Sequence, residues 1–102
     1  MSILLGNKLK ELREEQMPQR QLAAVLEIDT ATYCKIEKGD RRAKREQVDI
    51  LAKLLDFDKK KLVRLWSADK VYEIIADDDD ASNILNIVAE NIVAYKRKTT
   101  KV

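Results

Sequence analysis

An all-α fold is predicted for this 102-residue chain by its composition and by the spacing of its apolar residues. Glycine occurs twice and proline once, whereas 37% of the residues are charged and leucine, lysine, glutamate and alanine are abundant. Apolar residues recur at helical spacing, and no stretch alternates at the period of two that a strand requires. With 45% hydrophobic residues the chain can bury one core. We therefore expect one helical domain with an appendage.

The first predicted helix covers about residues 5–16 and is followed by a break at Pro18. A residue that precedes a proline is disfavoured in the helical conformation, so the first helix should end there. A proline is tolerated at the start of a helix, where its missing N–H costs nothing, and a second helix is expected over about residues 19–26. The buried stripe of the first helix consists of Leu5, Leu9 and Leu12.

The segment from Gln19 to Gly39 predicts two short helices joined by a tight turn. Asp29 stands where a helix N-cap is expected, and Gly39 follows the end of a helix over about residues 30–38. Helices this short must pack on each other and on flanking helices. This packing leaves one face of the second helix exposed, in a shape that fits a DNA groove. The apolar positions are Leu22, Val25, Leu26, Ile28, Tyr33 and Ile36.

Three further segments follow the tight turn. A helix over about residues 45–55 has an inner apolar face, and its second apolar face, at Ile50 and Leu54, needs a cover. Asp58 predicts the N-cap of the next helix, which either continues to Ile75 or breaks near Ser67. Four aspartates at 77–80 repel one another and predict a linker. A last helix is expected over about residues 81–95, with the remaining residues as a frayed tail. In the helix over about residues 45–55, the inner apolar face consists of Val48, Leu51, Ala52 and Leu55.

The net charge of +2 hides a local basic patch. Residues 1–66 carry 15 lysines and arginines against 11 acidic residues, whereas residues 67–102 carry 5 against 7. From Lys35 to Arg45 the count is six basic residues to two acidic ones. A patch of this kind, close to a helix with an exposed face, favours an anionic partner.

Several functional classes are disfavoured by what the sequence lacks. There is no histidine, and the single cysteine can form neither an internal disulfide nor a metal cluster. No nucleophile–base pair and no phosphate-binding glycine loop is recognisable, so we expect no enzyme, no cofactor and no small-molecule ligand. No membrane span or signal peptide is visible, and a cytoplasmic protein is expected.

Four parts of the sequence, in this order, resemble the phage-repressor (XRE/Cro) type of helix-turn-helix domain. They are residues 9–15 (LKELREE), Gln19 with Leu22 and Ala23, residues 28–39 (IDTATYCKIEKG) and residues 51–55 (LAKLL). The resemblance covers about residues 5–66 and implies a five-helix DNA-binding domain. We assign residues 1–66 to this domain and residues 67–102 to a C-terminal helical extension. One departure is Glu27 at a turn position that usually holds glycine. A left-handed backbone there would cost about 1 kcal/mol relative to glycine.

The resemblance implies that the helix over residues 30–38 enters the major groove of double-stranded DNA. Carried over position by position, the candidates for contact with base edges are Thr30, Ala31, Thr32 and Lys35. The candidates for contact with phosphates are Gln19, Arg20, Lys38, Arg41, Arg42 and Lys44. Such contacts predict an affinity that falls steeply with salt.

The extension predicts a homodimer, because one domain of this type contacts only one half-site. The alternative is a monomer in which the last helix folds back over the helix at 45–55. As a function we expect a sequence-specific transcriptional regulator, a dimeric repressor. A second hypothesis is an antitoxin or adapter whose C-terminal helix mainly binds a partner protein. The expected dimer contacts are Ile84, Ile87, Val88, Ile92 and Tyr95.

Overall fold

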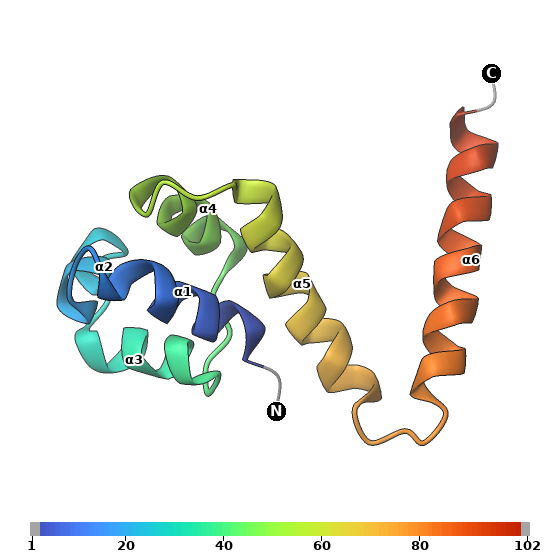
Figure 1. Cartoon of the computed structure of the whole chain (residues 1–102), viewed down its shortest axis with the longest axis horizontal. Helices are drawn as coiled ribbons and strands as arrows, with labels where there is room; N and C mark the ends of the chain where they lie inside the picture. The colour runs from blue at the N-terminus through green and yellow to red at the C-terminus, as the bar shows by residue number, and fades with distance from the viewer. Residues whose placement is uncertain (1–2, 101–102) are drawn as a thin grey trace.

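The computed structural model describes residues 3–100, with side chains described for residues 3–97, and this part of the chain is entirely helical (Figure 1). Six helices follow one another with short connections, and no strand occurs between residues 3 and 100. The all-α prediction is therefore confirmed. The helices are α1 (Leu4–Glu14), α2 (Gln19–Val25), α3 (Thr30–Lys38), α4 (Arg45–Leu54), α5 (Lys59–Ile75) and α6 (Ala81–Thr100).

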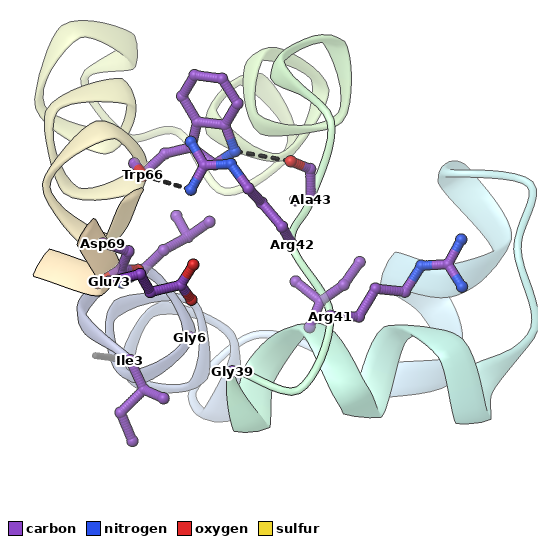
Figure 2. A pocket seen from close by; sticks show the side chains of 11 residues that line it. Ile3, Gly6, Gly39, Arg41, Arg42, Ala43, Trp66, Asp69 and Glu73 are labelled. Carbon is purple, nitrogen blue, oxygen red and sulfur yellow. Dashed lines mark hydrogen bonds between the residues drawn. The ribbon is translucent and has the colours of Figure 1, made fainter. Parts of the chain in front are cut away.

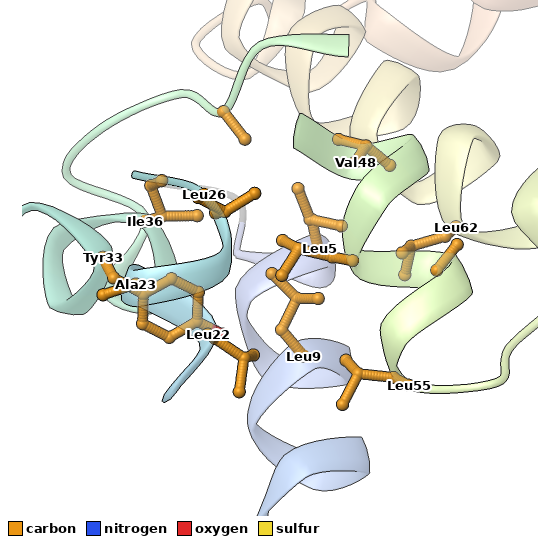
Figure 3. Close-up of a cluster of buried hydrophobic side chains, with 13 residues drawn as sticks. Leu5, Leu9, Leu22, Ala23, Leu26, Tyr33, Ile36, Val48, Leu55 and Leu62 are labelled. Carbon is orange, nitrogen blue, oxygen red and sulfur yellow. The ribbon is translucent and has the colours of Figure 1, made fainter. Parts of the chain in front are cut away.

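Helices α1–α5 form a compact head, in which α1 packs against both α3 and α5. Helix α2 packs on α3, and α4 packs on α5. Apolar side chains from all five helices meet in one core (Figure 3). Replacing a buried leucine by alanine in such a core typically lowers the free energy of unfolding by about 2–5 kcal/mol. The shared core therefore holds the five helices together as one unit. The largest completely buried side chains are Leu9, Leu22, Tyr33, Val48, Leu51 and Leu62.

The helix ends of the head agree closely with the sequence pattern. The side chain of Asp29 accepts a hydrogen bond of 2.6 Å from the backbone N–H of Thr32, and α3 ends at Gly39 with a left-handed φ of 81°. Asp58 caps α5 through the backbone N–H of Lys61. The backbone of Glu27 is left-handed, with φ 58°, as the resemblance implied. A second strained position, Asp56 with φ 53°, lies between α4 and α5.

Gly6 allows α1 and α3 to approach each other at backbone distance. A Cβ atom at this position would lie 2.1 Å from the carbonyl oxygen of Glu37. Gly6 is buried inside α1, where glycine is otherwise unfavourable for a helix. The close crossing therefore requires the absence of a side chain here.

Helix α5 is one continuous helix, so the open question of a break near Ser67 is settled in favour of the longer helix. Its residue Asp69 reaches back to the start of α1. The two carboxylate oxygens accept hydrogen bonds from the backbone N–H groups of Leu4 (3.0 Å) and Leu5 (3.1 Å). Ile3, the N-cap residue that precedes α1, makes no side-chain capping hydrogen bond. The helix thus crosses position 66, where we had placed the end of the domain, and remains attached to the head beyond it.

Helix α6 stands apart from the head, joined to α5 by the turn that contains Asp77–Asp80 (Figure 1). It does not fold back over α4, which was the monomer alternative. The frayed tail expected after residue 95 is wrong for residues 96–100, because the helix continues to Thr100, and residues 101–102 lie outside the described part. Helix formation is cooperative, and the helix propagates through the basic residues that follow Tyr95.

Candidate nucleic-acid interface

Helix α3 lies along one edge of the head and has two chemically distinct faces. Tyr33, Ile36 and Glu37 are buried against the core. A helix turns by about 100° per residue, so Ala31, Lys35 and Lys38 share the opposite face. All three are exposed. We refer to Ala31, Lys35 and Lys38 as the exposed stripe of α3.

The two threonines differ in their surroundings. Thr30 is exposed at the first position of α3, whereas Thr32 is half-buried beside the exposed stripe. The backbone N–H of Thr32 is already bound by Asp29. The hydrogen bonds from the side chain and then the backbone of Thr32 hold the pKa of Asp29 below its usual range, so this cap is ionised at neutral pH. The structure therefore brings all four predicted base-contact residues to one end or one face of α3.

Glu37 anchors the buried face of α3 to α1 and α2 through a charged network. Its carboxylate accepts two hydrogen bonds from the Arg13 guanidinium, from Nε and from Nη2, the latter at 2.9 Å. A third hydrogen bond of 3.0 Å comes from Nε2 of Gln19. Burial alone would raise the pKa of Glu37, but these hydrogen bonds outweigh burial, and the pKa is lowered. Burial and the nearby Glu37 carboxylate raise the pKa of Tyr33.

Gln19, which we expected at a phosphate, thus has a structural partner in this chain. A primary amide has two donor hydrogens, and Glu37 uses one of them. The phosphate contact expected from the sequence would use the other hydrogen. The structure therefore adds a role for Gln19 that the sequence did not indicate, namely joining α2 to α3.

Arg41 and Arg42, adjacent in the sequence, point in different directions (Figure 2). The Arg42 guanidinium lies over the Trp66 ring, 4.0 Å from its centroid, and Nη1 donates a hydrogen bond of 2.9 Å to the Trp66 carbonyl. The indole Nε1 of Trp66 donates a 2.7 Å hydrogen bond to the carbonyl of Ala43. Arg41 is exposed and extends away from Trp66 on the side of α3. Arg42 thus joins the loop before α4 to α5, and Arg41 is the better placed to meet a phosphate.

The pocket beneath Arg42 is a packing feature. Its volume is about 30 Å³, which is room for a single water molecule. It lies between α1, the loop after α3 and α5, with Gly6, Trp66 and Asp69 on its wall (Figure 2).

The remaining predicted phosphate contacts are spread around α3. Arg20 is exposed on α2, Lys38 belongs to the exposed stripe, and Lys44 is exposed where α4 begins. The backbone N–H of Lys44 donates a hydrogen bond of 2.9 Å to Oε1 of Gln47. This hydrogen bond uses the backbone of Lys44 and does not involve its side chain. Exposed basic side chains therefore come from α2, from α3 itself and from the start of α4.

The four residues that sequence reasoning missed are Arg13, Glu37, Gly6 and Asp69. One of them carried a local signal, since an isolated glycine inside a helical pattern often marks a close packing contact. The other three act across 24, 64 or 65 positions of the chain. No local pattern connects such positions.

Among residues 3–100, no cluster of three or more histidine, cysteine, aspartate or glutamate side chains is arranged to hold a metal ion. Within the same residues, no helix is both long and apolar enough to cross a membrane.

In a comparison with protein-family models, residues 4–74 match the model described as a helix-turn-helix domain. No curated protein and no solved structure matches the chain.

Proposed function

The chain belongs to this helix-turn-helix domain family, of the phage-repressor type, and from that premise we propose that it is a sequence-specific DNA-binding transcriptional regulator. It acts by binding rather than by catalysis, as a dimeric repressor that reads the major groove with α3. The observation that carries the proposal is the exposed stripe of α3, which includes two lysines, Lys35 and Lys38, and is followed by the exposed Arg41 and Lys44. An exposed helix face of this kind is what a major groove accommodates.

The positions of the side chains determine which of them contact bases and which contact phosphates in the proposed complex. Lys35 donates to acceptors on base edges, and the methyl group of Ala31 contacts apolar groups in the groove. Arg20, Lys38, Arg41 and Lys44 neutralise phosphates and set the register of the head on the duplex. Arg42 contributes indirectly, because it holds the loop that presents Arg41.

A dimer is proposed because the extension exposes apolar surface. Ile87 and Tyr95 are 67% and 68% exposed, and the head covers neither of them. Exposed apolar surface of this extent marks an interaction site in soluble proteins. A two-fold dimer would present two copies of α3 to two half-sites.

The exposed face of α6 is equally an observation in favour of the second hypothesis, an antitoxin or adapter that binds a partner protein. The two hypotheses differ in what occupies that face. Purification of the chain from its native cells with a stoichiometric second protein would support the adapter. A homodimer that binds DNA without such a protein would support the regulator.

A selection of random duplex DNA by the full chain tests the proposal directly. We expect one sequence motif to be enriched, and we expect Lys35→Ala to change the preferred bases within it. Lys70→Ala is the matched control, because Lys70 is an exposed lysine on α5 and does not belong to the exposed stripe of α3. Enrichment of no motif, or a motif that Lys35→Ala leaves unchanged, would contradict the assignment of base reading to α3.

A further inference from the structure

The exposed side chains of α6 include a seam with coiled-coil spacing. Leu85, Val88, Ile92 and Tyr95 follow one another at intervals of three, four and three residues, and each is between 40% and 68% exposed. Such spacing places all four on one face of a helix. The opposite face of α6 carries polar residues, among them Asn83, Asn86 and Glu90. Ile87 and Val93, which are also exposed, lie to either side of the seam, so the seam is the centre of a broad apolar face on which a partner helix fits.

The charges of α6 are separated along its axis. Asp77–Asp80 precede its first turn, Lys96 and Arg97 follow the seam, and Glu90 is the only charged residue from 81 to 95. A partner that complements this distribution presents basic groups at the start of α6 and acidic groups at its end. A second copy of α6 in the opposite direction has this arrangement.

We propose that α6 pairs with α6 of a second copy in an antiparallel orientation, with the seam residues as the buried layers. The inference rests on the dimer of the proposed function and adds its geometry. In the register that fills the seam, Leu85 lies beside Tyr95 of the partner copy and Val88 lies beside its Ile92. This register places Lys96 and Arg97 opposite residues 84 and 83 of the partner copy, about one helical turn from the end of its aspartate linker at Asp80. A parallel pair would instead juxtapose like charges at both ends.

Antiparallel pairing has a geometric consequence for the heads. The two copies of Ala81 would lie roughly 27 Å apart at a rise of about 1.5 Å per residue. The heads are attached at these positions, so they leave the paired helices from opposite ends. In a parallel pair both heads would leave from the same end.

The orientation can be tested by charge reversal in the full chain, with dimer affinity measured by sedimentation equilibrium. Asp77→Lys with Asp79→Lys should weaken the dimer about tenfold at low salt, and Lys96→Glu with Arg97→Glu should do the same. All four substitutions together should return the affinity close to that of the original chain. The seam is unchanged in every variant.

The four-substitution variant separates the proposal from a simpler role of the same charges. Acidic residues at the start of a helix and basic residues at its end also stabilise that helix through its dipole. If this were their only role, the four-substitution variant would be the weakest dimer. That result, or equal affinity in all variants, would overturn the antiparallel pairing. Circular dichroism shows in each case whether the head remains folded.

Cross-linking provides a second readout that does not depend on charge. In a background with Cys34→Ser, a short thiol-to-thiol cross-linker should join two copies of Asn91→Cys, which lies near the centre of the pair. It should not join two copies of Ser82→Cys, because these would be about 24 Å apart in the antiparallel register. Both residues are polar, exposed and beside the seam. Efficient cross-linking at both positions would indicate a parallel pair.

These outcomes are distinct from failure of the proposed function. A dimer that cross-links at both positions retains the dimeric regulator and rejects only the orientation. A chain that is monomeric at tens of micromolar rejects both the dimer and the pairing. Selection of a DNA motif is measured separately and reports on α3 alone.

Discussion

The carboxylate of Asp69, in the second half of α5, accepts a hydrogen bond of 3.1 Å from the backbone N–H of Leu5, in the first turn of α1. A second hydrogen bond comes from Leu4. The carboxylate thereby satisfies two of the N–H groups that the start of a helix leaves unpaired. This contact joins the start of α1 to the second half of α5, which leads to α6. The two positions are separated by more than half of the chain.

Replacement of Asp69 by alanine should lower the free energy of unfolding by about 1 kcal/mol, the usual cost of a lost N-cap, because two N–H groups lose their acceptor. Urea denaturation followed by circular dichroism measures the change. Asp79→Ala is the control, since Asp79 lies in the exposed linker before α6. Equal stability of the two variants would argue against a capping role for Asp69.

Substitution of Gly6 by alanine should be strongly destabilising, by about 3 kcal/mol, although alanine is the better helix former. The new Cβ would overlap the carbonyl oxygen of Glu37, a backbone atom that cannot rotate away. The neighbouring Asn7→Ala provides the comparison, because Asn7 is exposed on the same helix. Thermal denaturation distinguishes the two, and a Gly6 variant as stable as the original chain would show that α1 and α3 can separate freely.

Glu37→Gln should cost about 3 kcal/mol at neutral pH, because it leaves the Arg13 guanidinium without its charged partner. The pKa of Glu37 is lowered in the folded protein. Its contribution to stability is therefore fully present above the unfolded pKa, near 4.5, and is lost as the pH falls through the lower folded value. Urea denaturation between pH 7 and pH 3 should show the original chain converging toward the variant. A difference that is constant with pH would contradict this assignment.

Arg41 and Arg42 should give different results when each is changed to alanine. Arg41→Ala should reduce the slope of log affinity against log salt by about one, as expected for a lost phosphate contact. Arg42→Ala should instead lower thermal stability by roughly 1 kcal/mol, through loss of the contact with Trp66. Its effect on the salt slope should be smaller. The reverse pattern would show that Arg42 leaves Trp66 when DNA binds.

Glu27→Gly should stabilise the head by about 1 kcal/mol, because φ is 58° at this exposed position and glycine adopts the left-handed region without strain. Asp56→Gly should act similarly, since its φ is 53°. Denaturation in urea measures both. A loss of stability in either variant would mean that the side chain makes a contact worth more than the strain.

The features that the sequence predicted well are those determined by neighbouring residues. The cap at Asp29, the end of α3 at Gly39 and the left-handed turn at Glu27 each depend on a few consecutive positions. The bounds predicted for α3 agree with the structure for the same reason. Local backbone chemistry thus located the two helices and the turn on which the functional proposal depends.

The features that the sequence did not predict join distant segments. The Arg13–Glu37 pair and the Asp69 contact with α1 exist only after the core has brought their helices together. Arg42 looked like a member of a basic run, and only the position of Trp66 distinguishes it from Arg41. The continuation of α5 beyond Trp66 follows from the apolar residues at helical spacing, but the contact of Asp69 with α1 has no signal in the sequence.

Because α5 is continuous, its length determines where α6 lies and in which direction the apolar seam of α6 faces. Each residue inserted after Asp69 would move α6 outward by about 1.5 Å and rotate it by about 100° around the helix axis. In the proposed dimer, one added residue would turn the apolar seam away from the partner helix, whereas four would nearly restore its direction. The number of residues in α5 therefore sets the orientation of α6 relative to α3, and in the proposed dimer it would also set the spacing of the two half-sites.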